Sequence, residues 1–290
     1  MDKKAFLAGT IAALTWGTVF VFGQISVQTG FHPFLVALLR FLSASIFLAL
    51  YHFSKGGIFF LKSADIFNFI ILGASGIFGM NVFIFYSLKL TDSTITSLLM
   101  NTNGFIIGLL GFFLLKEKIS MMEIIGLIAG IGGCYLIFTQ GDIEKISHSN
   151  IAGNTLAVCA SFCWAFYSVW SKKTKVIDKY GAVLSTLWAS VSGTIMLGIA
   201  VLLLRIPLQF DIKNVLISVY LGIVPAGIGF ALWFYSINKL KTIIPGIIQF
   251  LAPLTTAILA VILLNQRISV TTIIGGLLIL AGILFTLKKQ

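Results

Sequence analysis

The feature that most constrains this fold is a series of long apolar runs, which together occupy most of the 290 residues. A transmembrane helix needs ~20 mostly apolar residues, and ten segments meet that requirement. Helices satisfy their own backbone hydrogen bonds in lipid, so the runs predict an all-α integral membrane protein with ten transmembrane helices. The predicted spans are residues 4–26, 34–53, 67–89, 93–115, 119–138, 151–171, 182–204, 214–237, 242–264 and 269–287.

The composition excludes a soluble protein. Charged residues make up 10% of the chain and hydrophobic residues 58%, whereas soluble domains carry roughly 25% charged residues. The net charge of +11 does not indicate a nucleic-acid partner, because no basic domain stands apart from the apolar runs. The excess of lysine is explained better by the positive-inside rule for membrane proteins. We therefore expect the lipid bilayer as the surrounding medium and no nucleic acid.

The chain contains an internal duplication with an offset of 149 residues. The sequence Phe-Tyr-Ser at residues 85–87 returns at 234–236, and Ile-Ile-Gly at 124–126 returns at 273–275. Five predicted spans separate the two copies, so equivalent spans cross the bilayer in opposite directions. Many secondary carriers are built from such inverted repeats. The duplication predicts two inverted five-helix repeats, over residues 1–140 and 150–290.

The distribution of positive charge predicts the orientation. If the N-terminus lies inside, 14 lysine and arginine residues fall in inner segments and 5 in outer segments. Positive charge is enriched on the cytoplasmic side of membrane proteins. We therefore expect a multi-pass protein of the plasma membrane with both termini in the cytoplasm.

Several short motifs resemble those of the drug/metabolite transporter superfamily, specifically its EamA-type members with two five-helix repeats. Residues 13–17 (Ala-Leu-Thr-Trp-Gly) and 161–165 (Ser-Phe-Cys-Trp-Ala) are similar to a signature of that family. So are Leu39-Arg40-Phe41, residues 114–119 and the mid-span Pro253. The resemblance implies a carrier of small metabolites, commonly an exporter of amino acids. It does not identify the substrate.

The two repeats differ where the family pattern would make them equal. Gly104 stands at the position equivalent to Pro253, Gln266 at the position equivalent to Glu117, and Ala189 or Trp188 opposite Arg40. A site shared equally by the two halves is therefore not expected. The unmatched residues are the better candidates for substrate choice.

The first group of candidate site residues consists of amides near the middle of their spans. The substrate site of an inverted-repeat carrier lies near the bilayer midplane, and an amide in hydrocarbon needs a partner. These amides therefore either bind substrate or join helices. Pro253 removes the backbone partner of the carbonyl four residues earlier, which predicts a free Gln249 carbonyl. This group is Asn81, Asn101, Asn103, Gln249 and Pro253.

The second group is aromatic and the third is a single arginine. Aromatic rings near mid-depth can line an apolar pocket, cage a cation, or simply pack; these are Trp16, Phe85, Trp164, Tyr167 and Trp233. Arg40 is a charged residue well inside a predicted span. It pairs with a substrate carboxylate, extends outward, or binds helix-end carbonyls.

Other functions find less support in the sequence. All nine acidic residues fall at span ends or in loops, so no membrane-embedded carboxylate for proton coupling is expected. No catalytic constellation, metal-ligand cluster or phosphate loop is present, which predicts a protein that is not an enzyme and binds no cofactor or metal. The main hypothesis is a carrier of a small-molecule substrate, as a monomer or homodimer. The alternatives are uptake of a quaternary ammonium such as choline and a non-transporting membrane subunit.

Overall fold

The computed structural model describes residues 2–91, 93–139, 150–208, 210–264 and 270–287, and every element assigned there is a helix. The first half contains α1 (Lys3–Gln28), α2 (Pro33–Ser54), α3 (Ser63–Leu72), the π-helix η1 (Gly73–Gly79), α4 (Met80–Leu90), α5 (Ser93–Met100), α6 (Asn103–Leu115) and α7 (Met121–Thr139). The second half contains α9 (Ile151–Lys173), α10 (Val176–Leu203), α11 (Ile212–Leu221), the π-helix η2 (Gly222–Ile228), α12 (Gly229–Lys239), α13 (Ile243–Ile248), α14 (Leu251–Leu264) and α15 (Val270–Leu287).

Local sequence explains where several helices begin. The Asp2 carboxylate accepts the backbone N–H of Lys4 at 2.9 Å and so caps α1. The Asn150 side chain caps α9 in the same way. Ser120 and Glu123 form a reciprocal capping box at the start of α7. Each contact satisfies backbone donors that a helix N-terminus would otherwise leave unpaired.

Eight helices within the described residues are long and apolar enough to cross a membrane. Two shorter apolar stretches, Ile243–Leu259 and Ile273–Phe285, coincide with the last two predicted spans. Each predicted span thus corresponds to one helix or to consecutive helices. The all-helical membrane fold is confirmed, while the count of ten crossings stays a prediction.

Interruptions of the helices occur at equivalent positions in the two halves. The π-helices η1 and η2 begin 149 residues apart, as do α4 and α12. A turn at residues 101–102 in the first half also has a counterpart at 249–250 in the second, one residue from the equivalent position. The duplication seen in the sequence therefore extends to the irregular parts of the backbone.

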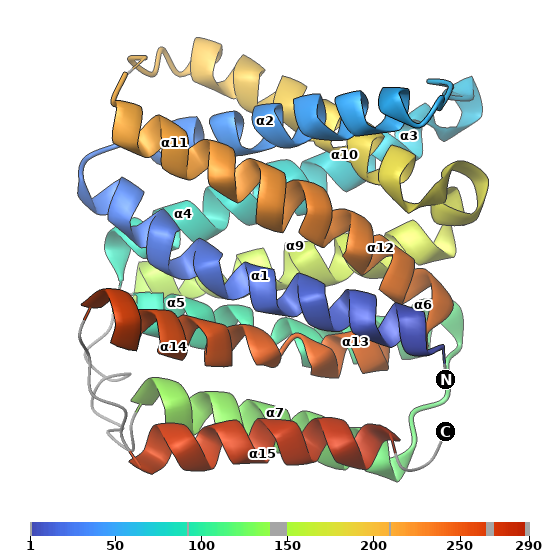
Figure 1. Ribbon diagram of the computed structural model, residues 1–290, viewed down its shortest axis with the longest axis vertical. Coiled ribbons are helices and arrows are strands. Elements are labelled where there is room, and N and C mark those ends of the chain that lie inside the picture. Colours follow the sequence, from blue (N-terminus) through green and yellow to red (C-terminus); the bar gives the residue numbers. More distant parts are fainter. Residues whose placement is uncertain (1, 92, 140–149, 209, 265–269, 288–290) are drawn as a thin grey trace.

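The helices lie side by side with their long axes roughly aligned, and the N-terminus and C-terminus lie at the same end (Figure 1). Lys172, near the end of α9, and Lys241, just before α13, lie at this end. We therefore call it the lysine-rich end. Helices α7 and α15 run antiparallel and form a pair at one edge of the molecule (Figure 1). Glycines allow their close approach, because a Cβ atom on Gly133 would lie 2.5 Å from the Gly275 carbonyl oxygen.

Candidate functional site

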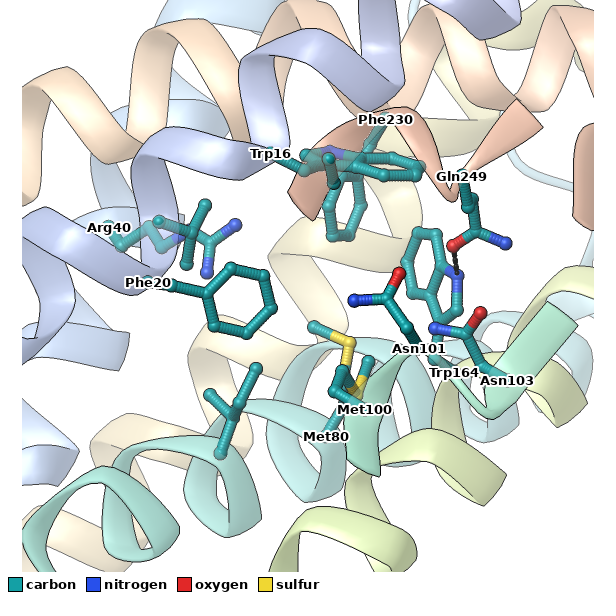
Figure 2. A pocket seen from close by; sticks show the side chains of 13 residues that line it. Trp16, Phe20, Arg40, Met80, Met100, Asn101, Asn103, Trp164, Phe230 and Gln249 are labelled. Atoms are coloured by element: carbon teal, nitrogen blue, oxygen red, sulfur yellow. Dashed lines mark hydrogen bonds between the residues drawn. The ribbon is translucent and has the colours of Figure 1, made fainter. Parts of the chain in front are cut away.

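A cavity in the interior is lined by residues of both halves of the chain (Figure 2). Its volume is about 50 Å³, counted over the positions that the centre of a water molecule can take. One water needs roughly 10–15 Å³ on this measure, so the space suits a small solute. The lining residues are Trp16, Val19, Phe20, Arg40, Met80, Ile84, Met100, Asn101, Asn103, Trp164, Phe230, Gln249 and Ala252.

Packed aromatic rings form one wall of the cavity. The Trp16 ring on α1 meets the Trp164 ring on α9 edge-on, with ring centroids 5.0 Å apart. Phe230 on α12 lies 4.9 Å from Trp164, and Trp233 lies behind Trp16 at 5.1 Å. Edge-to-face pairs at these separations are favourable. The wall therefore joins α1 of the first half to α9 and α12 of the second.

Amide side chains gather around Trp164 at one end of the cavity (Figure 2). The Trp164 indole N–H donates to Gln249 Oε1 at 2.7 Å, and Asn101 Nδ2 donates to the Ser97 carbonyl at 2.7 Å. Two buried polar atoms here, Asn103 Oδ1 and Gln249 Nε2, make no hydrogen bond within the described structure. One is an acceptor and the other a donor, and burying either without a partner is unfavourable. These atoms are therefore candidates to bind a polar ligand.

The predicted free carbonyl at Gln249 is wrong. Pro253 does lack the N–H that this carbonyl would accept in a regular α-helix. However, the backbone tightens here, and the Ala252 N–H donates to the Gln249 carbonyl at 2.9 Å. Pro253 is buried in α14 and is not one of the lining residues. The Gln249 side chain, rather than its backbone, reaches the site.

Arg40 lies at the opposite end of the cavity from the amides (Figure 2). Its side chain is buried, with a residue exposure of 2%. Nη1 donates to Asn81 Oδ1 at 2.8 Å and Nε donates to the Leu221 carbonyl at 3.2 Å. The alternative of an arginine that extends toward the membrane surface is therefore wrong. Arg40 does bind a helix-end carbonyl, because Leu221 is the last residue of α11.

The end of α11 and the irregular backbone of η2 provide the carbonyl groups that bind Arg40 and Trp16. In a regular α-helix the Leu221 carbonyl would accept the N–H of residue 225, but Pro225 has none. The Arg40 Nε–H donates to this carbonyl. The Pro225 carbonyl in turn accepts the Trp16 indole N–H at 3.0 Å. π-Helical segments often mark functional sites, and here one orients two lining side chains.

Six of the predicted site residues line the cavity and five do not. The lining ones are Trp16, Arg40, Asn101, Asn103, Trp164 and Gln249; the others are Asn81, Phe85, Tyr167, Trp233 and Pro253. Of the second set, Asn81 binds Arg40, and Tyr167 stacks on Trp164 with ring centroids 5.3 Å apart.

Sequence reasoning missed the apolar lining residues. They are Val19, Phe20, Met80, Ile84, Met100, Phe230 and Ala252. Phe230 had a usable signal, because it is the repeat equivalent of Asn81. No comparable signal marked the two methionines.

The ion pairs among the described residues all lie at the lysine-rich end and all join the two halves. Glu117 pairs with Lys172 at 2.9 Å, Asp65 with Lys179 at 2.8 Å, and Glu123 with Lys241 at 2.6 Å. Glu117 also accepts hydrogen bonds from the backbone and hydroxyl of Thr242. The acids are at helix ends, as predicted. Asp65 and Glu123 are nevertheless buried, because each is covered by its partner from the other half.

Several known proteins are similar to this chain over almost its whole length. An uncharacterized transporter of Archaeoglobus fulgidus is 30% identical over 292 residues, covering 100% of this chain and 99% of the relative. A probable amino-acid metabolite efflux pump of Salmonella typhimurium is 24% identical, covering 98% of this chain and 94% of its own. A solved crystal structure matches with a TM-score of 0.84 at 21% identity over 100% of both chains, and so shares the fold.

The family assignment rests on both halves. The model of the EamA-like transporter family matches residues 3–139 and, a second time, residues 151–288. The long apolar helices agree with a protein that crosses the membrane several times. This chain is therefore a multi-pass membrane protein that belongs to the EamA-like transporter family.

Proposed function

We propose that the protein is a secondary carrier that exports an amino acid or a related compound across the plasma membrane by alternating access. The observation that carries this proposal is the interior cavity, to which both halves contribute polar lining residues. A site at the interface of two repeats is the usual arrangement in secondary carriers. Asn103 Oδ1 and Gln249 Nε2 have no hydrogen-bond partner among the described residues, and a polar solute would satisfy them.

The proposal includes ten membrane crossings in two inverted five-helix repeats, with both termini in the cytoplasm. The equivalent backbone interruptions and the antiparallel pair of α7 and α15 support inversion. The two termini share the lysine-rich end (Figure 1). The positive-inside rule assigns this end to the cytoplasm.

Two observations support an amino acid as the substrate class. The relative from Salmonella typhimurium is named as a probable amino-acid metabolite efflux pump. The cavity also has the chemical variety that an amino acid needs, with a guanidinium, amides and apolar walls. The aromatic wall on its own would also suit a quaternary ammonium. Arg40 disfavours that alternative, because it places a positive charge in the same cavity.

Transport by purified protein in proteoliposomes tests the proposal. We expect Trp16→Ala, Asn103→Ala and Gln249→Ala each to lower the transport rate of an amino acid at least about tenfold, given the hydrogen bonds and ring contacts involved. Gln28→Ala is the matched control for Gln249→Ala, because Gln28 is exposed at the end of α1. Its transport should equal that of the wild-type protein.

The direction of transport is tested in cells. Overexpression should protect a strain against inhibitory amino acids or their analogues, and deletion of the gene should sensitise it. Sensitisation on overexpression would indicate uptake and contradict export. Normal transport by all three cavity variants would show that the substrate binds elsewhere.

A further inference from the structure

The positive charge of Arg40 has no acidic counter-ion among the described residues. Among the described residues, those that line the cavity include no aspartate or glutamate. The described ion pairs involve other residues, at the lysine-rich end. A guanidinium remains protonated at neutral pH. A buried charge without a counter-ion is unfavourable, so this end of the cavity favours an anion.

Neutral groups hold the guanidinium in a fixed position. Asn81 Oδ1 and the Leu221 carbonyl accept two of its five N–H groups. Asn81 is itself fixed, because its Nδ2 donates to the Ile77 carbonyl at 2.8 Å. The rings of Phe41 and Phe230 lie 5.1 and 5.9 Å from the guanidinium carbon. A planar guanidinium held in this way is suited to a carboxylate, which it can bind through two parallel hydrogen bonds.

The rest of the cavity adds apolar contacts and a second polar region. Phe20, Met80 and Met100 lie between Arg40 and the amide residues (Figure 2). Thioether side chains adapt to apolar groups of different shape. The unpaired Asn103 Oδ1 and Gln249 Nε2 lie at the far end. The arrangement fits a molecule that has an anionic group at one end and an apolar body.

We propose that Arg40 determines specificity by binding the carboxylate of the substrate. The carrier then takes amino acids and other monocarboxylates and rejects the corresponding amines, amides and quaternary ammonium ions. This inference rests on the proposed function and narrows it, because it requires an anionic group and not only an amphipathic solute.

Ligand binding to the full-length protein in detergent tests the inference without transport. The thermal shift of the wild-type protein is measured first with each of the twenty L-amino acids. The amino acid that binds most tightly is then compared with its carboxamide, its decarboxylated amine and its deaminated carboxylic acid, and also with choline. We expect the amino acid and the deaminated acid to bind. The amide, the amine and choline should bind at least about tenfold more weakly, because they lack the charge-assisted pair.

Substitutions at Arg40 connect this preference to one residue. Arg40→Gln should weaken binding of the carboxylates at least about tenfold and reduce the discrimination against the amide. Arg205→Gln is the matched control, because Arg205 is exposed beyond the end of α10. Its affinity and its selectivity should remain those of the wild-type protein.

Two further variants keep the test decisive if Arg40→Gln fails to fold. Arg40→Lys retains the charge but not the planar fork, so the affinity should fall while carboxylates remain preferred. Asn81→Ala removes a neutral partner of Arg40 and should weaken carboxylate binding without favouring amines. Size-exclusion chromatography and the melting temperature without ligand verify that each variant is folded.

The outcomes separate this inference from the proposed function. Equal binding of the amine or of choline, unchanged selectivity in a folded Arg40→Gln variant, or no binding by any probe would overturn it. Binding of carboxylic acids but of no amino acid would support the role of Arg40 in carboxylate binding and contradict amino-acid export. Carboxylate binding that depends on Arg40, with no transport in proteoliposomes, would support the proposed binding site and contradict the proposed carrier function.

Discussion

At the scale of single residues, the bond between Trp164 and Gln249 sets the polarity of the amide end of the cavity. The indole N–H occupies Gln249 Oε1 at 2.7 Å. The amide nitrogen of Gln249 is then left as a buried donor without a partner within the described structure. Trp164 thus acts on the site twice, as a wall and as the group that orients a donor.

The substitution Trp164→Phe should lower both stability and ligand affinity. It leaves Gln249 Oε1 buried without its donor, which costs about 1–3 kcal/mol. Trp170→Phe is the matched control, because the Trp170 indole nitrogen makes no hydrogen bond within the described structure. Melting temperatures of the two variants provide the comparison. A loss in Trp170→Phe as large as in Trp164→Phe would show that ring volume, and not the hydrogen bond, stabilises the site.

Sequence reasoning at this scale succeeded for polar residues and failed for apolar ones. An amide or arginine inside an apolar run is unusual, so Asn101, Asn103, Gln249 and Arg40 could be selected from the sequence alone. Met80 could not be selected, because hydrophobic residues make up 58% of the chain and most of them face other helices or lipid. Which apolar residue faces a cavity depends on how the helices pack.

At the scale of elements, η2 affects the site through Pro225, the proline that lies within it. Pro225→Ala restores a backbone N–H near the Leu221 carbonyl, which then competes with Arg40 for the same acceptor. We expect weaker carboxylate binding by a fewfold to tenfold, with little loss of thermal stability. Pro245→Ala in α13 is the control, because Pro245 lies in the first turn of its helix, where proline is tolerated. Unchanged binding in Pro225→Ala would show that Arg40 does not need this carbonyl.

The sequence predicted where the membrane spans lie, but it did not predict where most of their helices are interrupted. Runs of ~20 apolar residues located the spans because the bilayer thickness imposes that length. Proline drew attention to the break near Gln249, but the first half breaks at 101–102 with Gly104 at the equivalent position. The first π-helix, Gly73–Gly79, also contains no proline. Neither interruption contains a proline that would indicate it in the sequence.

The pair of α7 and α15 depends on glycines at their contact. Gly133→Ala should destabilise the protein by about 1–3 kcal/mol, because the new methyl group would lie 2.5 Å from the Gly275 carbonyl oxygen. Gly132→Ala is the matched control, since no atom outside its own helix lies within 4 Å of the added methyl group. Alanine favours helices over glycine, so this control should be neutral or slightly stabilising. Thermal unfolding of both variants measures the difference, and equal melting temperatures would contradict close packing at this contact.

At the scale of the whole molecule, the two halves share the same backbone arrangement but contribute different side chains to the site. Arg40 is opposite Ala189 in the second half, and Asn81 is opposite Phe230. Both Asn81 and Phe230 nevertheless contact the same guanidinium. The two halves share the duplicated framework, and the unmatched residues give the cavity a cationic end and an amide end.

The ion pairs at the lysine-rich end connect the two halves. Under the proposed alternating access, they should favour the conformation in which that end is closed. In Glu117→Gln combined with Glu123→Gln, each pair loses its negative charge while the side-chain shape is kept. Glutamine also preserves the capping box of α7. Each partly buried pair contributes up to about 1 kcal/mol, so the double variant should open this end severalfold more often.

A cysteine at Met100, in a background without native cysteines, should then react faster with a membrane-impermeant maleimide added from the lysine-rich side. Asp178→Asn is the control, because Asp178 accepts a hydrogen bond from Asn238 within the second half. Equal labelling rates in the double variant and the wild-type background would show that these pairs do not hold the end closed.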